Sequence, residues 1–136
     1  MVSGKGLNML TDTFKYTSKW EFDKESHLTQ LISDVNDTLS TIGNYTCDSI
    51  GNVIKLKYIF SSHREPDLYY YKYDTQSHMV EKSLNDTHFL LQKSTFRYMA
   101  FDPHNNWIKR AVHWQSFSPM VEASRNYVEN RKITYY

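Results

Sequence analysis

The chain has 136 residues, and 16 Lys and Arg against 15 Asp and Glu give it a formal net charge of +1. Hydrophobic residues make up 40% and charged residues 23%, a balance that is ordinary for a globular protein and excludes a disordered chain. The near-neutral charge excludes the strongly basic profile of a general nucleic-acid binder. No apolar run is long enough to span a bilayer, so we expect no membrane association.

A chain of this length normally forms one domain. Residues 1–10 lack the apolar core of a secretory signal, and we expect a flexible leader there, followed by a single α+β domain over residues 11–136. Cys47 is the only cysteine, which excludes an intrachain disulfide and favours a reducing, cytoplasmic compartment. No internal repeat is evident. The abundance of Lys, Asn, Ile and Tyr is typical of AT-rich coding and favours a phage, viral or mobile-element source.

The first predicted element is a strand over residues 11–22. Aromatic and polar side chains alternate there, so that Tyr16 and Trp20 share one face and Lys19 and Glu21 the other. Residues 24–42 follow with apolar side chains at spacings of three and four. This spacing predicts an amphipathic helix, with Asp23 as its N-cap and Gly43 as its stop.

The remainder of the chain predicts an antiparallel meander. Alternating apolar and polar residues, separated by turn residues, predict strands over 53–60, 67–74, 78–84, 88–101 and 107–117. Ser118 and Pro119 are a favoured helix start and predict a short C-terminal helix to about residue 131, with an edge strand over 133–136. The predicted fold is a long helix packed on a curved antiparallel sheet, which is similar at the level of the fold to cystatin-like and other helix-grip folds.

The histidines give only weak indications of catalysis. None of the six has the spacing of a zinc site, and the four glycines leave no loop that could cradle a phosphate, so we predict no metal and no cofactor. A small metal-free ribonuclease needs little more than His, Arg and Tyr in a cleft. The candidates for such a site are His63, Arg64, His104 and His113.

Basic residues lie among aromatic residues in the C-terminal third. Residues 92–136 carry seven Lys or Arg against three Asp or Glu. Arg97 lies between Phe96 and Tyr98, and Lys109 and Arg110 follow Trp107. Aromatic and basic side chains on strands are typical of proteins that stack single-stranded nucleic acid. We therefore keep single-stranded RNA or DNA as an alternative partner.

The tyrosine-rich strand is the basis of the preferred functional hypothesis. Tyr69, Tyr71 and Tyr73 are expected on one face, with Leu68 and Tyr70 on the other. One helix cannot cover both faces of a sheet, and exposed Tyr and Trp are enriched at protein interfaces. The sequence thus predicts a non-enzymatic interaction module whose aromatic sheet face binds a protein partner or a second copy of the chain.

Overall fold

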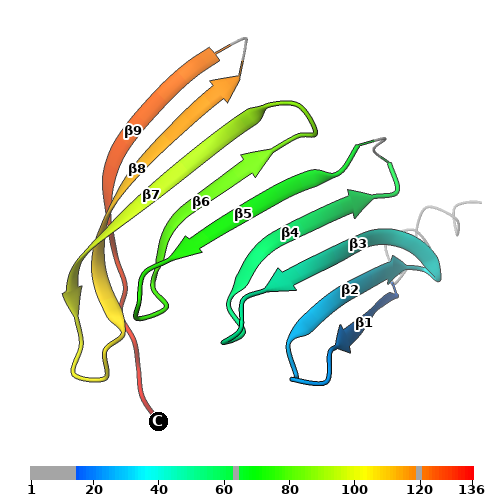
Figure 1. Cartoon of the computed structure of the whole chain (residues 1–136), viewed down its shortest axis with the longest axis horizontal. Coiled ribbons are helices and arrows are strands. Elements are labelled where there is room, and N and C mark those ends of the chain that lie inside the picture. Colours follow the sequence, from blue (N-terminus) through cyan, green and yellow to red (C-terminus); the bar gives the residue numbers. More distant parts are fainter. Residues whose placement is uncertain (1–14, 63–64, 119–120) are drawn as a thin grey trace, which may run out of the picture.

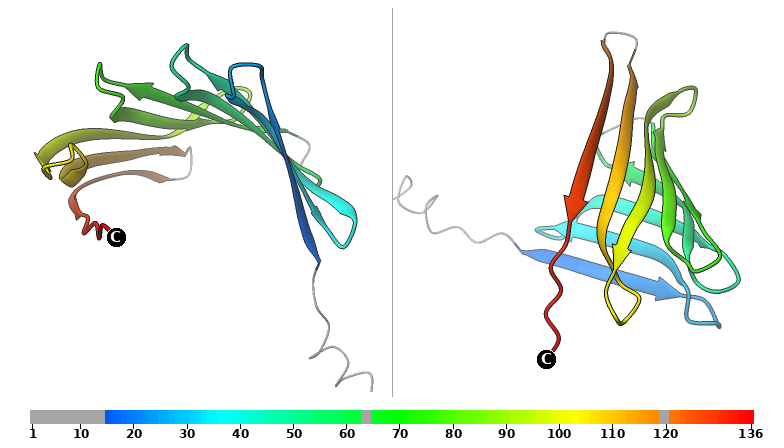
Figure 2. Two further views of the ribbon diagram at one scale, coloured as in Figure 1. Left: turned by 90° about the horizontal axis from the view of Figure 1, so that it is seen from below. Right: turned by 90° about the vertical axis from the view of Figure 1, so that its left-hand side faces the viewer.

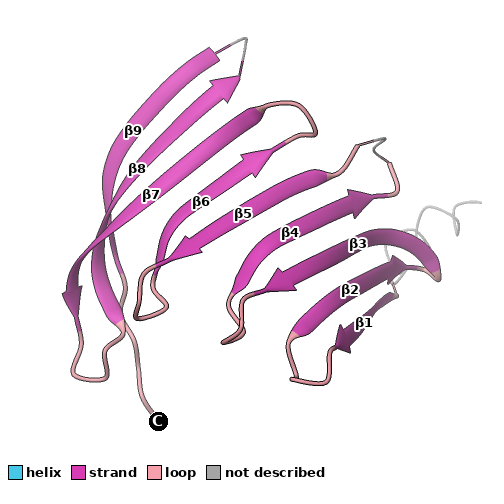
Figure 3. Ribbon diagram, in the orientation of Figure 1, coloured by secondary structure: helices cyan, strands magenta, loops and turns pink. Residues whose placement is uncertain are grey.

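The computed structural model describes residues 15–62, 65–118 and 121–136. The described residues form nine strands and no helix (Figures 1 and 3). The strands are β1 (Tyr16–Phe22), β2 (Leu28–Val35), β3 (Thr38–Cys47), β4 (Val53–Phe60), β5 (Asp67–Tyr73), β6 (Met79–Asn85), β7 (Leu90–Phe101), β8 (Trp107–Ser118) and β9 (Val121–Asn130). No helix among these residues is long and apolar enough to cross a membrane.

All nine strands belong to one antiparallel sheet, in which each strand pairs with its neighbours in the sequence. The sheet is a single open layer that bends and twists strongly between β1 and β9 (Figure 2). No described element packs across either of its faces. The fold is therefore held together by backbone ladders and by contacts between side chains on neighbouring strands.

The predicted helix over residues 24–42 is wrong, and with it the α+β class and the similarity to helix-grip folds. The segment forms β2, a tight turn and the first half of β3. Asn36 and Asp37 have φ values of 51° and 61°, which is the conformation of a two-residue hairpin turn. The apolar spacing of three and four arises because Leu31 and Ile32 point to opposite faces of β2. Gly43, the expected helix stop, lies inside β3, where an added Cβ would be 3.1 Å from the Tyr45 ring.

The predicted C-terminal helix is also wrong. Residues 121–130 form β9, which pairs with β8 over its whole length, and residues 133–136 form no strand. Pro119, the expected first helical residue, lies outside the described residues. Of the remaining predictions, the strand over 53–60 is confirmed in full, and those over 67–74, 78–84, 88–101 and 107–117 are confirmed within two residues at each end.

One turn occurs four times, which corrects the expectation that the chain has no internal repeat. The turns begin at Asp23, Asp48, Asp74 and Asp102 and join β1 to β2, β3 to β4, β5 to β6 and β7 to β8. In each turn the aspartate N–H donates to the carbonyl four residues later, at 2.8 to 2.9 Å. The fourth residue of each turn has a positive φ, and these residues are Ser26, Gly51, Ser77 and Asn105. The unit is thus a two-stranded hairpin, and all four turns lie at the same end of the sheet (Figure 1).

The aspartate is the residue that closes each turn. In the β5–β6 turn, Oδ1 of Asp74 accepts hydrogen bonds from the backbone N–H groups of Gln76 and His78, both at 2.9 Å. The other three aspartates accept from the equivalent N–H groups at 2.9 to 3.1 Å. Partial burial by itself raises the pKa of Asp74, but the N–H donors outweigh it and the pKa lies below its ordinary value.

We expect Asp74→Ala to destabilise the protein by about 1 kcal/mol at neutral pH, because two N–H groups of a partly exposed turn lose their acceptor. The ionised carboxylate stabilises the fold fully above the ordinary Asp pKa of about 4, and this contribution is lost as the pH falls through the lower pKa of the folded state. Urea unfolding at several pH values measures both effects. Gln76→Ala in the same turn is the matched control and should change little; an equal loss in both variants would contradict the assignment.

Candidate functional site

The candidate site is the face of the sheet that carries most of the aromatic side chains. Residues paired across neighbouring strands share a face, so the register assigns each side chain. The pairs Tyr45 with Leu56, Leu56 with Tyr69, and Phe96 with Val112 define this face. Besides polar residues such as Arg110, the aromatic face carries Tyr16, Trp20, Tyr45, Leu56, Tyr58, Phe60, Tyr69, Tyr71, Tyr73, Phe96, Tyr98, Val112, Trp114 and Tyr127.

No second layer of described residues packs on the aromatic face. Among the residues whose burial is described, Val112 has the only buried side chain, with 2% of its surface exposed, and Gly43 is the only other buried residue. Trp20 is 54% exposed and Tyr127 is 44% exposed. An ordinary domain buries such side chains against a second layer, and the described part of the chain forms none.

The opposite face is more polar. A central ion-pair group joins Glu81 to Lys72 at 3.0 Å and to Lys93 at 3.2 Å. Lys55, Lys57 and Tyr70 also belong to this face. Its apolar part is a row that includes Ile32, Ile42 and Ile59. The two faces therefore differ in chemistry, and the aromatic one is the stronger candidate for binding.

Charged and aromatic groups stack at the β7–β8 end of the aromatic face. The guanidinium of Arg110 is 4.1 Å from the Phe96 ring centroid and 4.3 Å from that of Trp107. Arg131 lies 4.2 Å from the Trp107 ring centroid. The Nε of Arg110 donates to Oε2 of Glu129 at 2.5 Å, so the charge of Arg110 is neutralised inside the stack. Such cation–π contacts hold the rings in fixed orientations.

The tyrosines of β5 are partly shielded from water by their neighbours. Burial raises the pKa of Tyr69 and Tyr73, and it raises the pKa of Tyr71 to about 12. The hydroxyl of Tyr73 donates to the carbonyl of Val53 at 2.8 Å, which ties the end of β5 to β4. The middle of the aromatic face is therefore ordered and only partly hydrated before any partner binds.

The structure separates the residues that the sequence predicts for binding. Tyr69, Tyr71 and Tyr73 share one face, as expected, and Arg110 lies with them. Simple alternation along β8 would place Trp107 on the other face, along with Lys109. The register of β7 and β8 shifts between Ala100 and Phe101, and the Trp107 ring lies on the aromatic side instead. It lies against Arg110, and its centroid is 6.2 Å from that of the Tyr98 ring.

The other two basic candidates lie on the opposite face. Arg97 pairs with Ala111, and Lys109 is two positions from Ala111 on the same strand. Arg97 and Lys109 therefore do not converge with Arg110. Sequence spacing brings the three together, but the alternation along β7 and β8 divides them.

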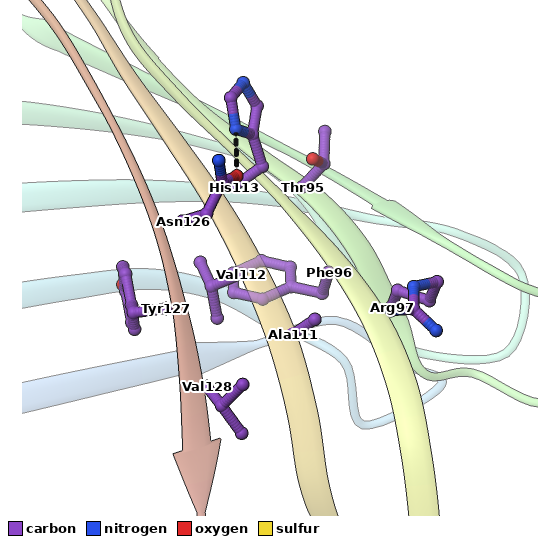
Figure 4. A pocket seen from close by; sticks show the side chains of 9 residues that line it. All are labelled: Thr95, Phe96, Arg97, Ala111, Val112, His113, Asn126, Tyr127 and Val128. Atoms are coloured by element: carbon purple, nitrogen blue, oxygen red, sulfur yellow. Dashed lines mark hydrogen bonds between the residues drawn. The ribbon is translucent and has the colours of Figure 1, made fainter.

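A shallow pocket on β7, β8 and β9 contains one of the catalytic candidates (Figure 4). Nδ1 of His113 lies 2.6 Å from Oδ1 of Asn126, and Arg97 lines the same pocket. Tyr127 also lines it but belongs to the other face of the sheet. His104 lies in the β7–β8 turn with its ring centroid 4.3 Å from that of Tyr135. His104 does not line the pocket that contains His113, and the ribonuclease hypothesis stays a prediction. His63 and Arg64 lie outside the described residues.

One group of side chains has the composition of a metal site. Ligand atoms of Asp23, Glu25 and His27 lie within 4.8 Å of one another in the β1–β2 turn. Oδ1 of Asp23 already accepts the backbone N–H groups of Glu25 and His27. In the β1–β2 turn, Nδ1 of His27 lies 3.4 Å from Oδ2 of Asp23. The equivalent atoms of His78 and Asp74 lie 3.3 Å apart in the β5–β6 turn, so the turn itself accounts for this cluster.

Sequence reasoning missed Phe96, Tyr98 and Tyr127 as members of the aromatic face. The turn aspartates recur after 25, 26 and 28 residues, at positions 23, 48, 74 and 102. Aligning the hairpins on them brings Tyr58, Leu84 and Val112, each ten residues later, to one face. It does not place Phe96 and Tyr98, because register shifts between Tyr98 and Phe101 put them out of phase with Tyr69 and Tyr71. No protein-family model, curated protein or solved structure matches the chain. The geometry alone therefore carries the functional argument.

The raised pKa of Tyr71 predicts a loss of stability in alkali. Its folded pKa of about 12 lies above the ordinary value of 10, so the stabilisation is complete below pH 10 and is lost as the pH rises towards 12. We expect Tyr71→Phe, which cannot ionise, to lose less stability than the native protein over this interval. Chemical denaturation at stepped pH values measures the difference, and identical losses in the two proteins would contradict the burial of this hydroxyl.

Proposed function

We propose that the chain is a non-enzymatic interaction module and that another protein surface covers its aromatic face. The observation that carries the proposal is the absence of a core: among the described residues, Val112 is the only buried side chain. Apolar area contributes roughly 25 cal/mol per Å² when it leaves water, and aromatic side chains carry large areas of this kind. A partner that covers the face would gain this contribution.

The composition of the aromatic face supports a protein partner. Tyrosine and tryptophan are enriched at the centres of protein interfaces, where a broad apolar ring and a polar tip can both find contacts. The three tryptophans of the chain, Trp20, Trp107 and Trp114, all belong to this side of the sheet. The lone Cys47 favours a reducing compartment, so a cytoplasmic location stays a prediction.

Photo-crosslinking from β5 tests the proposal. We expect p-benzoylphenylalanine at position 71 to form crosslinks to protein when the chain is irradiated in the cells that produce it, or to a second copy when the purified protein is irradiated. The same residue at position 70 is the matched control, because Tyr70 lies on the opposite face of the same strand. An aromatic replacement at either position preserves the strand. Equal yields from both positions, or none from position 71, would contradict the proposal.

A single-stranded nucleic-acid interface is less well supported by this geometry. Arg97 and Lys109 lie away from Arg110, whose charge is neutralised by Glu129. We therefore expect the fluorescence anisotropy of a labelled single-stranded oligonucleotide to stay flat on titration at low salt. Micromolar binding that weakens steeply with salt would instead show phosphate contacts, and would favour nucleic-acid binding by these basic residues as the function.

A further inference from the structure

The last strand, β9, is a regular and unprotected sheet edge. Its ten residues pair with β8 from Val121 to Asn130 without a register shift, and none of the other described strands pairs with its outer side. Edge strands of this length direct unpaired N–H and C=O groups outward and are usually interrupted by a bulge or a proline. The other edge, β1, is shorter and has a register shift near Phe22. The edge at β9 is therefore the better template for a further strand.

Three residues of β9 give this edge a self-complementary charge pattern. Arg125, Tyr127 and Glu129 occupy successive positions on the aromatic face. Arg125 lies 5.1 Å from the Trp114 ring centroid and makes no ion pair with any described residue. Glu129 binds Arg110 through Oε2, and its Oε1 accepts no hydrogen bond from the described residues. The Arg125 cation on one side of Tyr127 and the Oε1 atom of Glu129 on the other thus remain available for a partner.

We propose that β9 pairs antiparallel with β9 of a second copy, about a two-fold axis at Tyr127. In this register Arg125 of each copy lies opposite Glu129 of the other, and the two Tyr127 side chains lie opposite each other. Directly opposite side chains of an antiparallel pair are about 5 Å apart at Cβ, close enough for both kinds of contact. The pairing is isologous, as in most dimers.

Neighbouring registers lose this complementarity. A centre at Asn126 places Arg125 opposite Tyr127, and a centre at Val128 places Arg125 opposite Arg131 of the second copy. The other edge offers less, because Lys19 already forms an ion pair with Glu21 of its own strand, at 2.8 Å. The charges of β9 therefore select both the partner and the register.

The dimer joins two sheets into one. A two-fold axis perpendicular to the plane of the sheet keeps both aromatic faces on the same side, so the dimer presents one continuous aromatic surface. This inference concerns the edge of the sheet and not the aromatic face itself. It can fail while the proposed function holds, and the reverse is also true.

Charge reversal tests the register. We expect R125E and E129R each to weaken the dimer by about tenfold or more in sedimentation velocity, because two opposite-charge pairs become like-charge pairs. An equimolar mixture of the two variants should restore the dimer, since each reversed charge then meets its opposite. K19E makes the same change of charge on β1 and should leave the dimer intact.

Disulfide trapping tests the axis without relying on the fold of E129R, in which Arg110 loses its carboxylate. In a C47S background, Y127C should form an interchain disulfide on oxidation, because residue 127 lies opposite itself. R125C in the same background should not, since residue 125 lies opposite residue 129. A native protein that stays monomeric at micromolar concentrations, a mixture that fails to restore the dimer, or equal trapping at both positions would overturn the inference. Crosslinking from position 71 would still test the aromatic face separately.

Discussion

The structure depends on one constraint, which is that the sheet is a single layer with two faces and that the described residues place no second layer on either. Hydrogen bonds between neighbouring strands satisfy the backbone N–H and C=O groups, and contacts between side chains on these strands shield part of each side chain. Among the described residues, however, only Val112 has a buried side chain. Side chains that would form the core of a two-layered domain are instead spread over one surface. The aromatic face is thus the surface that we propose a partner covers.

The repeated turn explains how such a sheet is specified without a core. Each of the four hairpins is closed by an aspartate that accepts two backbone N–H groups, so the register of each strand pair is fixed locally. The link from Asn52 Nδ2 to Ser77 Oγ, at 3.1 Å, joins two neighbouring turns. Local register then decides which residues share a face, and this brings the tyrosines of β5 into line with Phe96 and Trp114.

The sequence predicts much of this arrangement, but it does not predict that the described residues form a single layer. Alternation correctly places β4 and the faces of β5, because a period of two is unambiguous when turn residues bound it. The segment over residues 24–42 misleads, since Leu31 and Ile32 serve different faces and Asn36 and Asp37 form a turn that no glycine marks. A helix predicted over these residues would cover one face of the sheet, whereas the described residues form no such helix. The split of Arg97 from Arg110 likewise follows from register, which composition cannot supply.

The most direct test of the central claim is the collisional quenching of tryptophan fluorescence by acrylamide as the protein is diluted. All three tryptophans lie on the aromatic side of the sheet, so their emission reports on that surface alone. An uncovered face predicts efficient quenching in the dilute monomer and protection, with a blue shift, when a protein surface covers it. A strict monomer whose tryptophans are shielded at every concentration would show that the chain covers this face by itself, and would contradict the account.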